Sequence, residues 1–98
     1  MRVISRKKLR RFWTARPDAE TPLQGWYQAV RSAQWKSFAE VRRAFAHADQ
    51  VGRCTVFNIG GNKYRLIAAI HYNRGIVYVR NVLTHAQYDV GVWKEECR

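Results

Sequence analysis

The residues of this chain that are best suited to chemistry are basic and aromatic, and they lie in its second half. Lys63 and Arg65 alternate along a run of β-branched and aromatic residues, and Arg80 lies in the next such run. Cations that share one face of a sheet can hold a phosphate group and offset the charge that develops on it in a transition state. The alternative is a set of solvated cations on a sheet face, which is also common.

A histidine follows the second of these runs. His85 belongs to the segment Thr84–Asp89, and Tyr88 lies three residues further on, so one helical turn would bring both side chains to the same side. A histidine can exchange protons near neutral pH as a general acid or base. Taken by itself, the pattern favours a simpler interpretation, in which Thr84 caps a helical start and His85 is packed without a chemical role.

Other catalytic patterns are missing from the sequence. We find no suitably spaced pair of carboxylates, no nucleophilic serine motif and no phosphate-binding glycine loop. Cys54 and Cys97 form no CxxC motif and have no neighbouring pair of histidines, so we expect neither a zinc site nor a disulfide, in a reduced and cytoplasmic protein. His47 and His71 are expected at the surface. Any catalysis would then use basic and aromatic groups, with no metal and no cofactor.

The charge of the chain indicates a polyanionic partner. Its 98 residues include 18 lysines and arginines against seven acids, which gives a net charge of +11. A small domain that is merely soluble carries a charge of about 2–8, so a nucleic acid, the ribosome or a strongly acidic protein is the favoured partner. The length predicts one domain over residues 1–98. No apolar run reaches the roughly 20 residues of a membrane span, and we expect no membrane association.

Helices are predicted for residues 5–50. The first has Ser5 as its N-cap and ends at Pro17. Its stripe at helical spacing consists of Leu9, Phe12, Trp13 and Arg16. The exposed residues around this stripe that we expect to grip RNA or the ribosome are Arg6, Lys7, Lys8, Arg10 and Arg11. Thr21 is expected to cap a second helix with Pro22 at its first position, and Ser37–Glu40 opens a third helix with a capping-box pattern.

After Gln50 the hydrophobic period changes to two, which predicts strands. The expected strands are Cys54–Ile59, Asn62–Tyr72 and Ile76–Leu83, with a further short edge strand at Met1–Ile4. Glycine-containing turns separate the three longer strands. The predicted fold class is therefore α+β, with N-terminal helices followed by an antiparallel β-meander.

The register of the last hairpin decides whether the two arginines meet. With a two-residue turn at Asn73-Arg74, Ile67 opposes Arg80, and Arg65 and Arg80 are diagonal neighbours about 7–8 Å apart on one face. A three-residue turn would place them on opposite faces, because a slip of one residue reverses every side chain. The sequence leaves both registers open.

The motifs resemble those of a known family. The segment Val56–Ile67, which contains Gly-Gly-Asn-Lys-Tyr-Arg, followed by Val77–Arg80 and Leu83–Asp89, closely resembles HigB toxins of the RelE-like superfamily. The resemblance implies a compact RelE-like, microbial-RNase-like domain that cleaves mRNA in the ribosomal A site. It further implies metal-independent attack of the ribose 2′-hydroxyl on the adjacent phosphate. The implied partner is a HigA-type helix-turn-helix antitoxin, through which alone the toxin would meet operator DNA.

The resemblance also implies roles for single residues. Lys63, Arg65 and Arg80 match its basic positions and would hold the phosphate and offset its growing charge. His85 and Tyr88 match the Thr-His-x-x-Tyr-Asp motif as groups that handle protons or stack on a base. Asp89 completes the motif and would orient Arg80 or His85, or cap the following turn.

Two other readings of the basic surface stay open. The chain could be a non-catalytic RNA- or ribosome-binding module, or a degenerate toxin that keeps its antitoxin but no longer cuts. Catalysis requires the five motif residues to converge on one spot, whereas a binding module spreads its basic groups along a groove.

Overall fold

The predicted α+β order is confirmed in the computed structural model, which describes residues 1–98. The elements in chain order are β1 (Arg2–Ile4), α1 (Arg6–Ala15), the 3₁₀ helix η1 (Pro17–Ala19), α2 (Glu20–Ser32), α3 (Phe38–Ala44), β2 (Asp49–Val51), β3 (Cys54–Ile59), β4 (Tyr64–His71), β5 (Ile76–Thr84), α4 (His85–Val90) and the 3₁₀ helix η2 (Val92–Cys97). The helices are thus not all N-terminal, because α4 and η2 follow the meander. No helix is long and apolar enough to cross a membrane.

One five-stranded sheet forms the centre of the molecule, in the order β1-β5-β4-β3-β2. Strands β3, β4 and β5 form the expected antiparallel meander, and β1 lies at one edge, parallel to β5. Strand β2 at the other edge was not predicted. It has only three residues, which include polar ones, and it forms because it pairs with β3 across the turn at Gly52-Arg53.

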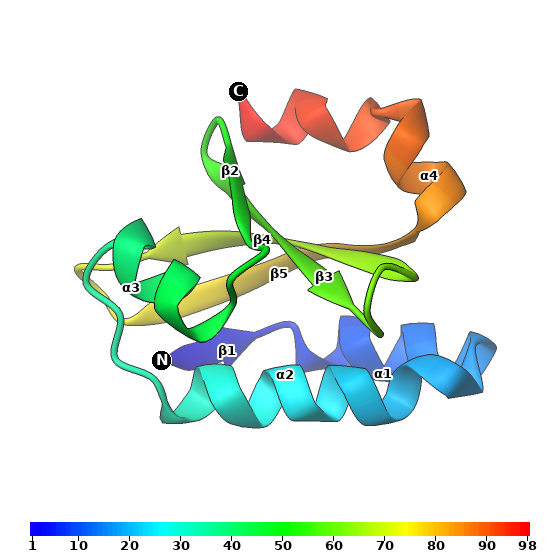
Figure 1. The fold of residues 1–98 in the computed structure, drawn as a ribbon, viewed down its shortest axis with the longest axis horizontal. Coiled ribbons are helices and arrows are strands. Elements are labelled where there is room, and N and C mark those ends of the chain that lie inside the picture. The colour runs from blue at the N-terminus through cyan, green and yellow to red at the C-terminus, as the bar shows by residue number, and fades with distance from the viewer.

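Helical layers cover both faces of this sheet (Figure 1). Helices α1 and α2 lie against one face, where Leu9, Leu23, Trp26, Phe57 and Leu66 belong to the main core. The C-terminal segment α4–η2 lies over the other face, above a smaller cluster of Cys54, Val56, Ile67, Trp93 and Cys97. Burial on both faces explains why β3 and β4 are apolar almost throughout, unlike a strand with one solvated face.

One predicted helix start and two predicted side-chain caps need correction. Pro17 begins the 3₁₀ turn η1, which leads directly into α2, so Thr21 lies inside this helix and does not cap it. Pro22 is tolerated there because the first turn of a helix has no use for its missing N–H. Ser5 and Ser37 stand at the predicted N-cap positions, but neither makes a side-chain cap bond. The Glu40 carboxylate instead accepts the backbone N–H of Lys36, at 3.2 Å.

The expectation that the cysteines stay unpaired is wrong. Cys54 at the start of β3 and Cys97 at the end of η2 form a disulfide, with their Cα atoms 5.2 Å apart. The pairing follows from the path of the C-terminal segment, which returns over the sheet and brings together positions 43 residues apart. Local spacing carries no sign of such a long-range contact, and for that reason the sequence motifs did not reveal it.

Candidate active site

A β-bulge decides which side chains meet at the end of the sheet. Near the β4–β5 turn the strands pair in the register expected of a two-residue turn, but in the middle of β4 the pairing shifts by one residue. Arg80 is the extra residue of this bulge, and Arg65 consequently lies opposite Leu83. The diagonal neighbour of Arg65 on β5 is therefore Asn81 and not Arg80, and His85 follows the strand as the first residue of α4.

Arg65 is a buried cation that has no acidic partner. Arg65 is one of the two polar or charged residues that are buried, and it is only 9% exposed. The guanidinium donates hydrogen bonds to the backbone carbonyls of Asn62 and Tyr64, at 3.1 and 3.2 Å, and to the Asn62 side-chain oxygen. These neutral oxygens fix the direction of the guanidinium without cancelling its charge, so the group is prepared for an anion.

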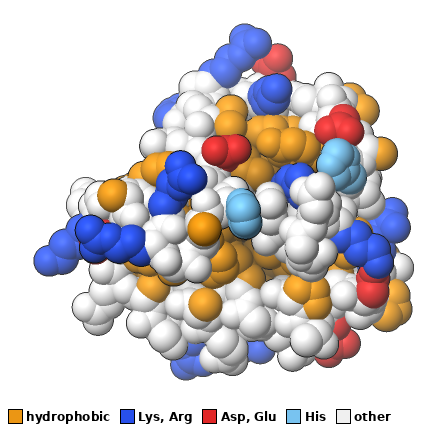
Figure 2. Space-filling model, in the orientation of Figure 1, with side chains coloured by type: hydrophobic (Ala, Val, Ile, Leu, Met, Phe, Trp, Pro, Cys, Tyr) orange, Lys and Arg blue, Asp and Glu red, His pale blue; other side chains and the backbone are white.

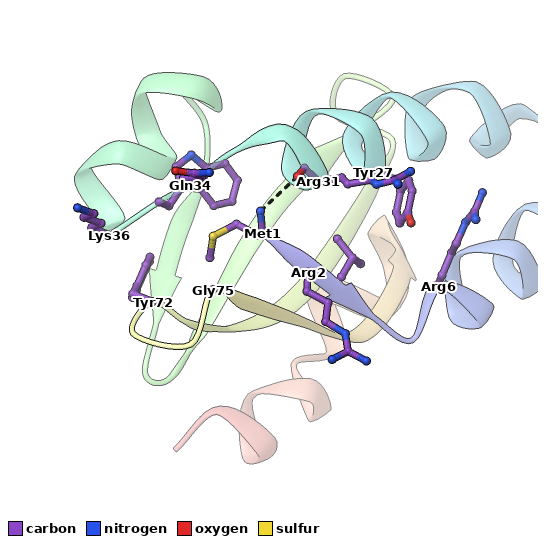
Figure 3. A pocket seen from close by; sticks show the side chains of 11 residues that line it. Met1, Arg2, Arg6, Tyr27, Arg31, Gln34, Lys36, Tyr72 and Gly75 are labelled. Carbon is purple, nitrogen blue, oxygen red and sulfur yellow. Dashed lines mark hydrogen bonds between the residues drawn. The ribbon is translucent and has the colours of Figure 1, made fainter.

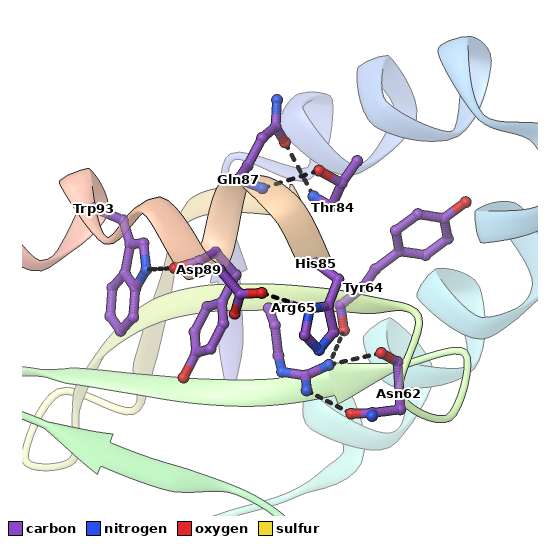
Figure 4. A network of polar contacts seen from close by, with 9 residues as sticks. Asn62, Tyr64, Arg65, Thr84, His85, Gln87, Asp89 and Trp93 are labelled. Carbon is purple, nitrogen blue, oxygen red and sulfur yellow. Dashed lines mark hydrogen bonds and ion pairs between the residues drawn. The ribbon is translucent and has the colours of Figure 1, made fainter.

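Helix α4 brings a histidine to the same place. Thr84 and Gln87 form a capping box, in which Thr84 N–H donates to the Gln87 side chain at 3.0 Å and Gln87 N–H donates to Thr84 Oγ1 at 3.2 Å. His85 follows directly, half exposed, with its Nδ1 at 3.0 Å from an Asp89 oxygen. Figure 4 shows the imidazole on the same side as the Arg65 guanidinium. A carboxylate at Nδ1 orients the ring and leaves Nε2 to meet a substrate.

Tyr88 completes this cluster from the next turn of α4. Its ring lies under the Arg65 guanidinium, whose central carbon is 5.2 Å from the ring centroid. On its other side the ring stacks on Trp93, with centroids 5.0 Å apart and planes inclined by 15°. The indole Nε1 of Trp93 donates to the Tyr88 carbonyl at 2.9 Å. Arg65, Tyr88 and Trp93 thus form one continuous stack.

Lys63 lies outside the cluster. It forms an ion pair with Asp18, which also accepts a hydrogen bond from the Tyr64 hydroxyl at 2.7 Å. The hydrogen bond from Lys63 holds the pKa of the Asp18 carboxyl below its usual range. The same contact raises the pKa of the Lys63 ammonium, and the bond to Asp18 raises that of Tyr64. The side chains of this pair remain 62% and 45% exposed, so water screens their attraction.

Arg80 also lies apart from Arg65, in a basic hollow between α1 and β5. This cavity of about 430 Å³ is lined by Lys8, Arg11 and Arg16 of the N-terminal half, and by Gln87 of α4. The Lys8 ammonium donates to the Arg80 carbonyl at 3.0 Å. The five basic residues expected on the first helix are all exposed on α1. The hollow therefore connects the basic face of α1 with the helix that holds His85.

A larger cavity, of about 800 Å³, lies far from this chemistry (Figure 3). It is bounded by β1, the end of α2 and the β4–β5 turn, and it includes Arg2, Arg31, Lys36 and Tyr72. Seven residues of extended chain separate Tyr72 from Arg65, a distance of about 23 Å. Volume alone is thus a poor guide to the candidate active site in this protein.

Sequence reasoning named three members of the cluster, Arg65, His85 and Tyr88, and missed two neighbours. Asn62 lies within the motif, directly after the turn glycines, and anchors Arg65. Trp93 was recognised only as one of several aromatic residues, because its contact with Tyr88 depends on how the chain turns after Gly91, a residue in the left-handed region at φ 83°. The i, i+4 spacing of His85 and Asp89 was the one local sign of their contact.

The fold and this cluster define a class. A five-stranded sheet with helical layers on both faces, and an arginine–histidine–tyrosine group where the meander meets a short C-terminal helix, is the architecture of a RelE-like toxin domain. The chain belongs to the HigB toxin family, whose model is described as the RelE-like toxic component of a toxin–antitoxin system and matches residues 19–91.

Relatives of the chain match nearly all of it. The "mRNA interferase toxin HigB" of Escherichia coli strain K12 is 27% identical over 92 residues, which span 91% of this chain and 88% of the relative. The "mRNA interferase HigB" of Shigella flexneri has the same identity and coverage. That of Escherichia coli O6:H1 is 26% identical, over 91% of this chain and 89% of its own.

Proposed function

We propose that this protein is an mRNA endonuclease that acts on the ribosome, inhibits translation and is neutralised by a HigA-type antitoxin in the cytoplasm. The observation that supports the proposal best is the buried Arg65 guanidinium, which has no acidic partner and adjoins His85 and Tyr88. The names of the relatives, which are mRNA interferases, agree with it. A phosphate is the anion that such a preformed cation would receive.

The proposed reaction is an internal transfer of the RNA phosphate. The ribose 2′-oxygen forms a bond to the adjacent phosphorus while the bond to the 5′-oxygen of the next nucleotide breaks, which leaves a 2′,3′-cyclic phosphate and a 5′-hydroxyl. Arg65 offsets the charge that grows on the phosphate oxygens. His85, oriented by Asp89, exchanges a proton with the attacking or the leaving oxygen. The Tyr88 ring lies between Arg65 and Trp93, so its hydroxyl, and not a ring face, is the group it offers to the substrate.

The remaining motif residues act at the margins of this centre. Lys63 would hold a neighbouring phosphate after giving up its contact with Asp18, an exposed ion pair that is easily exchanged. Arg80 would bind backbone phosphate in the hollow beside α1, where Lys8 and Arg11 extend the basic surface. RNA bound along α1 could follow this surface to α4. The antitoxin, a helix-turn-helix protein, would cover part of the same charge, and operator DNA would be met only through it.

A non-catalytic RNA- or ribosome-binding module is the second candidate. One observation favours it: Lys63 and Arg80 lie apart from the Arg65–His85–Tyr88 cluster, as basic groups do along a binding groove. Binding alone would not require a histidine held by a carboxylate next to a buried arginine. The first candidate accounts for this arrangement, and a cleavage assay separates the two.

The test compares induced wild-type protein with His85→Ala and Arg80→Ala, while the 5′ ends of mRNA on ribosomes are mapped. His47→Ala and Arg74→Ala are matched controls, because both residues are exposed and lie in turns away from the cluster. We expect growth arrest with A-site cuts in the wild type and both controls. Loss of a general acid or base lowers cleavage by about 10²–10⁴-fold in His85→Ala. Normal growth with intact mRNA in every strain would favour the binding module, and equal cutting of naked mRNA would exclude ribosome dependence.

A further inference from the structure

The last residues of the chain are clamped to the turn between β2 and β3. The Cys54–Cys97 disulfide joins the end of η2 to β3, and the Arg53 N–H donates to the Cys97 carbonyl at 2.6 Å. At Gly52 a Cβ atom would come within 2.0 Å of that same carbonyl oxygen, so only glycine permits this approach. Three adjoining contacts thus fix the position at which the C-terminal segment ends.

The other end of this segment reaches the candidate active site. Trp93 is 5% exposed and packs in the small cluster that contains Cys54, Val56 and Cys97. Its ring supports Tyr88 from below, and Tyr88 in turn lies against the Arg65 guanidinium. Figure 4 shows Trp93 on the same side of the sheet as Arg65 and His85, and Figure 2 shows apolar side chains gathered on the face below the C-terminal segment.

Little else holds the segment in place. Helix η2 has only six residues, and its 3₁₀ geometry gives poorer hydrogen bonds than an α-helix. Of these six residues, only Trp93 and Cys97 are buried, whereas Val92 is 70% exposed. The position of Trp93 therefore depends on its own packing, on the bond from its Nε1 to the Tyr88 carbonyl, and on the covalent bond four residues further along the chain.

We propose that Trp93 is a positioning residue for Tyr88 and Arg65, and that the Cys54–Cys97 disulfide makes this support sensitive to reduction. A dithiol would donate two electrons and two protons, break the S–S bond to give two cysteine thiols, and itself become a cyclic disulfide. Release of Cys97 would free the end of η2, let Trp93 leave the Tyr88 ring and loosen the stack under Arg65. This inference rests on the proposed function, because its consequence for activity is slower cleavage of mRNA.

The first test reduces the folded protein. Wild type is assayed for mRNA cleavage on ribosomes before and after treatment with dithiothreitol, beside the double variant Cys54→Ser/Cys97→Ser, with thiols counted and far-UV circular dichroism recorded. We expect two thiols to appear in the wild type. We expect kcat to fall about three- to tenfold, which is the ratio that corresponds to the free energy of one aromatic contact. The double variant should have the lower rate from the start, and dithiothreitol should leave that rate unchanged. Equal rates in all three states would overturn the proposal.

A second measurement is independent of activity. Hydrogen exchange of the wild type should rise on reduction in the peptide that covers 84–98, including Tyr88, while the core strand β4 stays protected. If exchange rises only over 92–98 and Tyr88 keeps its protection, the clamp does not reach the site and the proposal is wrong. If the oxidised protein never cuts mRNA, the proposed function fails, yet this exchange pattern still decides the positioning role.

The third comparison tests Trp93 itself. Trp93→Phe keeps a stacking ring but loses the bond from Nε1 to the Tyr88 carbonyl, and Trp93→Leu loses both. A positioning role predicts that Trp93→Phe keeps most of the wild-type kcat and that Trp93→Leu does not. KM should change little in both variants, because the RNA-binding surface of α1 is untouched. A merely structural role predicts equal rates per folded molecule for both variants, once the folded fraction has been measured by urea unfolding.

Discussion

At the scale of single residues, the two basic positions of the Gly-Gly-Asn-Lys-Tyr-Arg motif have opposite surroundings. Arg65 is buried among neutral oxygens and an aromatic ring, whereas Lys63 is exposed and paired with a carboxylate. The sequence shows both as cations two positions apart and cannot separate them. The difference depends on Asp18, which lies 45 residues away in the chain and reaches the turn only in the folded protein.

The Asp18 contacts predict an acid-dependent contribution to stability. Its pKa is lowered in the folded state by the bonds from Lys63 and Tyr64, so the unfolded state binds the proton more readily. The contribution is complete above the ordinary carboxyl value of 3.8 and is lost as the pH falls from there through the lowered pKa. In urea unfolding, wild type should therefore exceed Asp18→Asn in stability at pH 6, and the gap should narrow progressively as the pH falls below 3.8. A gap that is independent of pH would contradict this account.

At the scale of elements, the bulge in β5 and the cap of α4 together place the chemistry. The sequence predicted the meander and its turns because period-two runs and glycine turns are local signals. It could not predict the bulge, because the residue types of Arg80 and Asn81 do not distinguish these positions from those of a regular strand. The slip of one residue moves Arg80 away from Arg65, and His85 reaches the Arg65 side from the first turn of α4. The family motif therefore named Arg65, His85 and Tyr88 together, but it could not show that Arg80 lies apart from them.

The cap of α4 gives a prediction at this scale. Thr84 Oγ1 accepts the Gln87 N–H, and without it a short helix that holds both His85 and Tyr88 loses its start. Thr84→Ala should lower the free energy of unfolding by about 1 kcal/mol, whereas Thr84→Ser, which keeps the acceptor, should cost a few tenths at most. Urea unfolding measures both. Identical losses in the two variants would show that the γ-methyl group, and not the cap, stabilises this junction.

At the scale of the whole molecule, the sequence predicted the fold class better than the tertiary links. Composition and period indicated an α+β chain with a large positive charge, and these properties are sums over many residues. The disulfide between Cys54 and Cys97 is a single contact between distant positions, and for that reason the sequence did not predict it. The same holds for the support of Tyr88 by Trp93, where the chain must first turn at Gly91.

The charge of the whole molecule yields a last prediction, on the salt dependence of RNA binding. If the basic face of α1 contacts phosphates, each lost contact lowers the slope of log K against log salt concentration by about 0.7 for a single strand. Arg10→Ala/Arg11→Ala should therefore bind ribosomes or mRNA more weakly and with a slope smaller by about 1.4. The measurement uses a His85→Ala background, so that cleavage does not disturb the equilibrium. The matched control is Arg42→Ala/Arg43→Ala, an adjacent, exposed pair in the last turn of α3. Equal losses in both pairs would mean that net charge alone, and not the face formed by α1, determines how this toxin meets RNA.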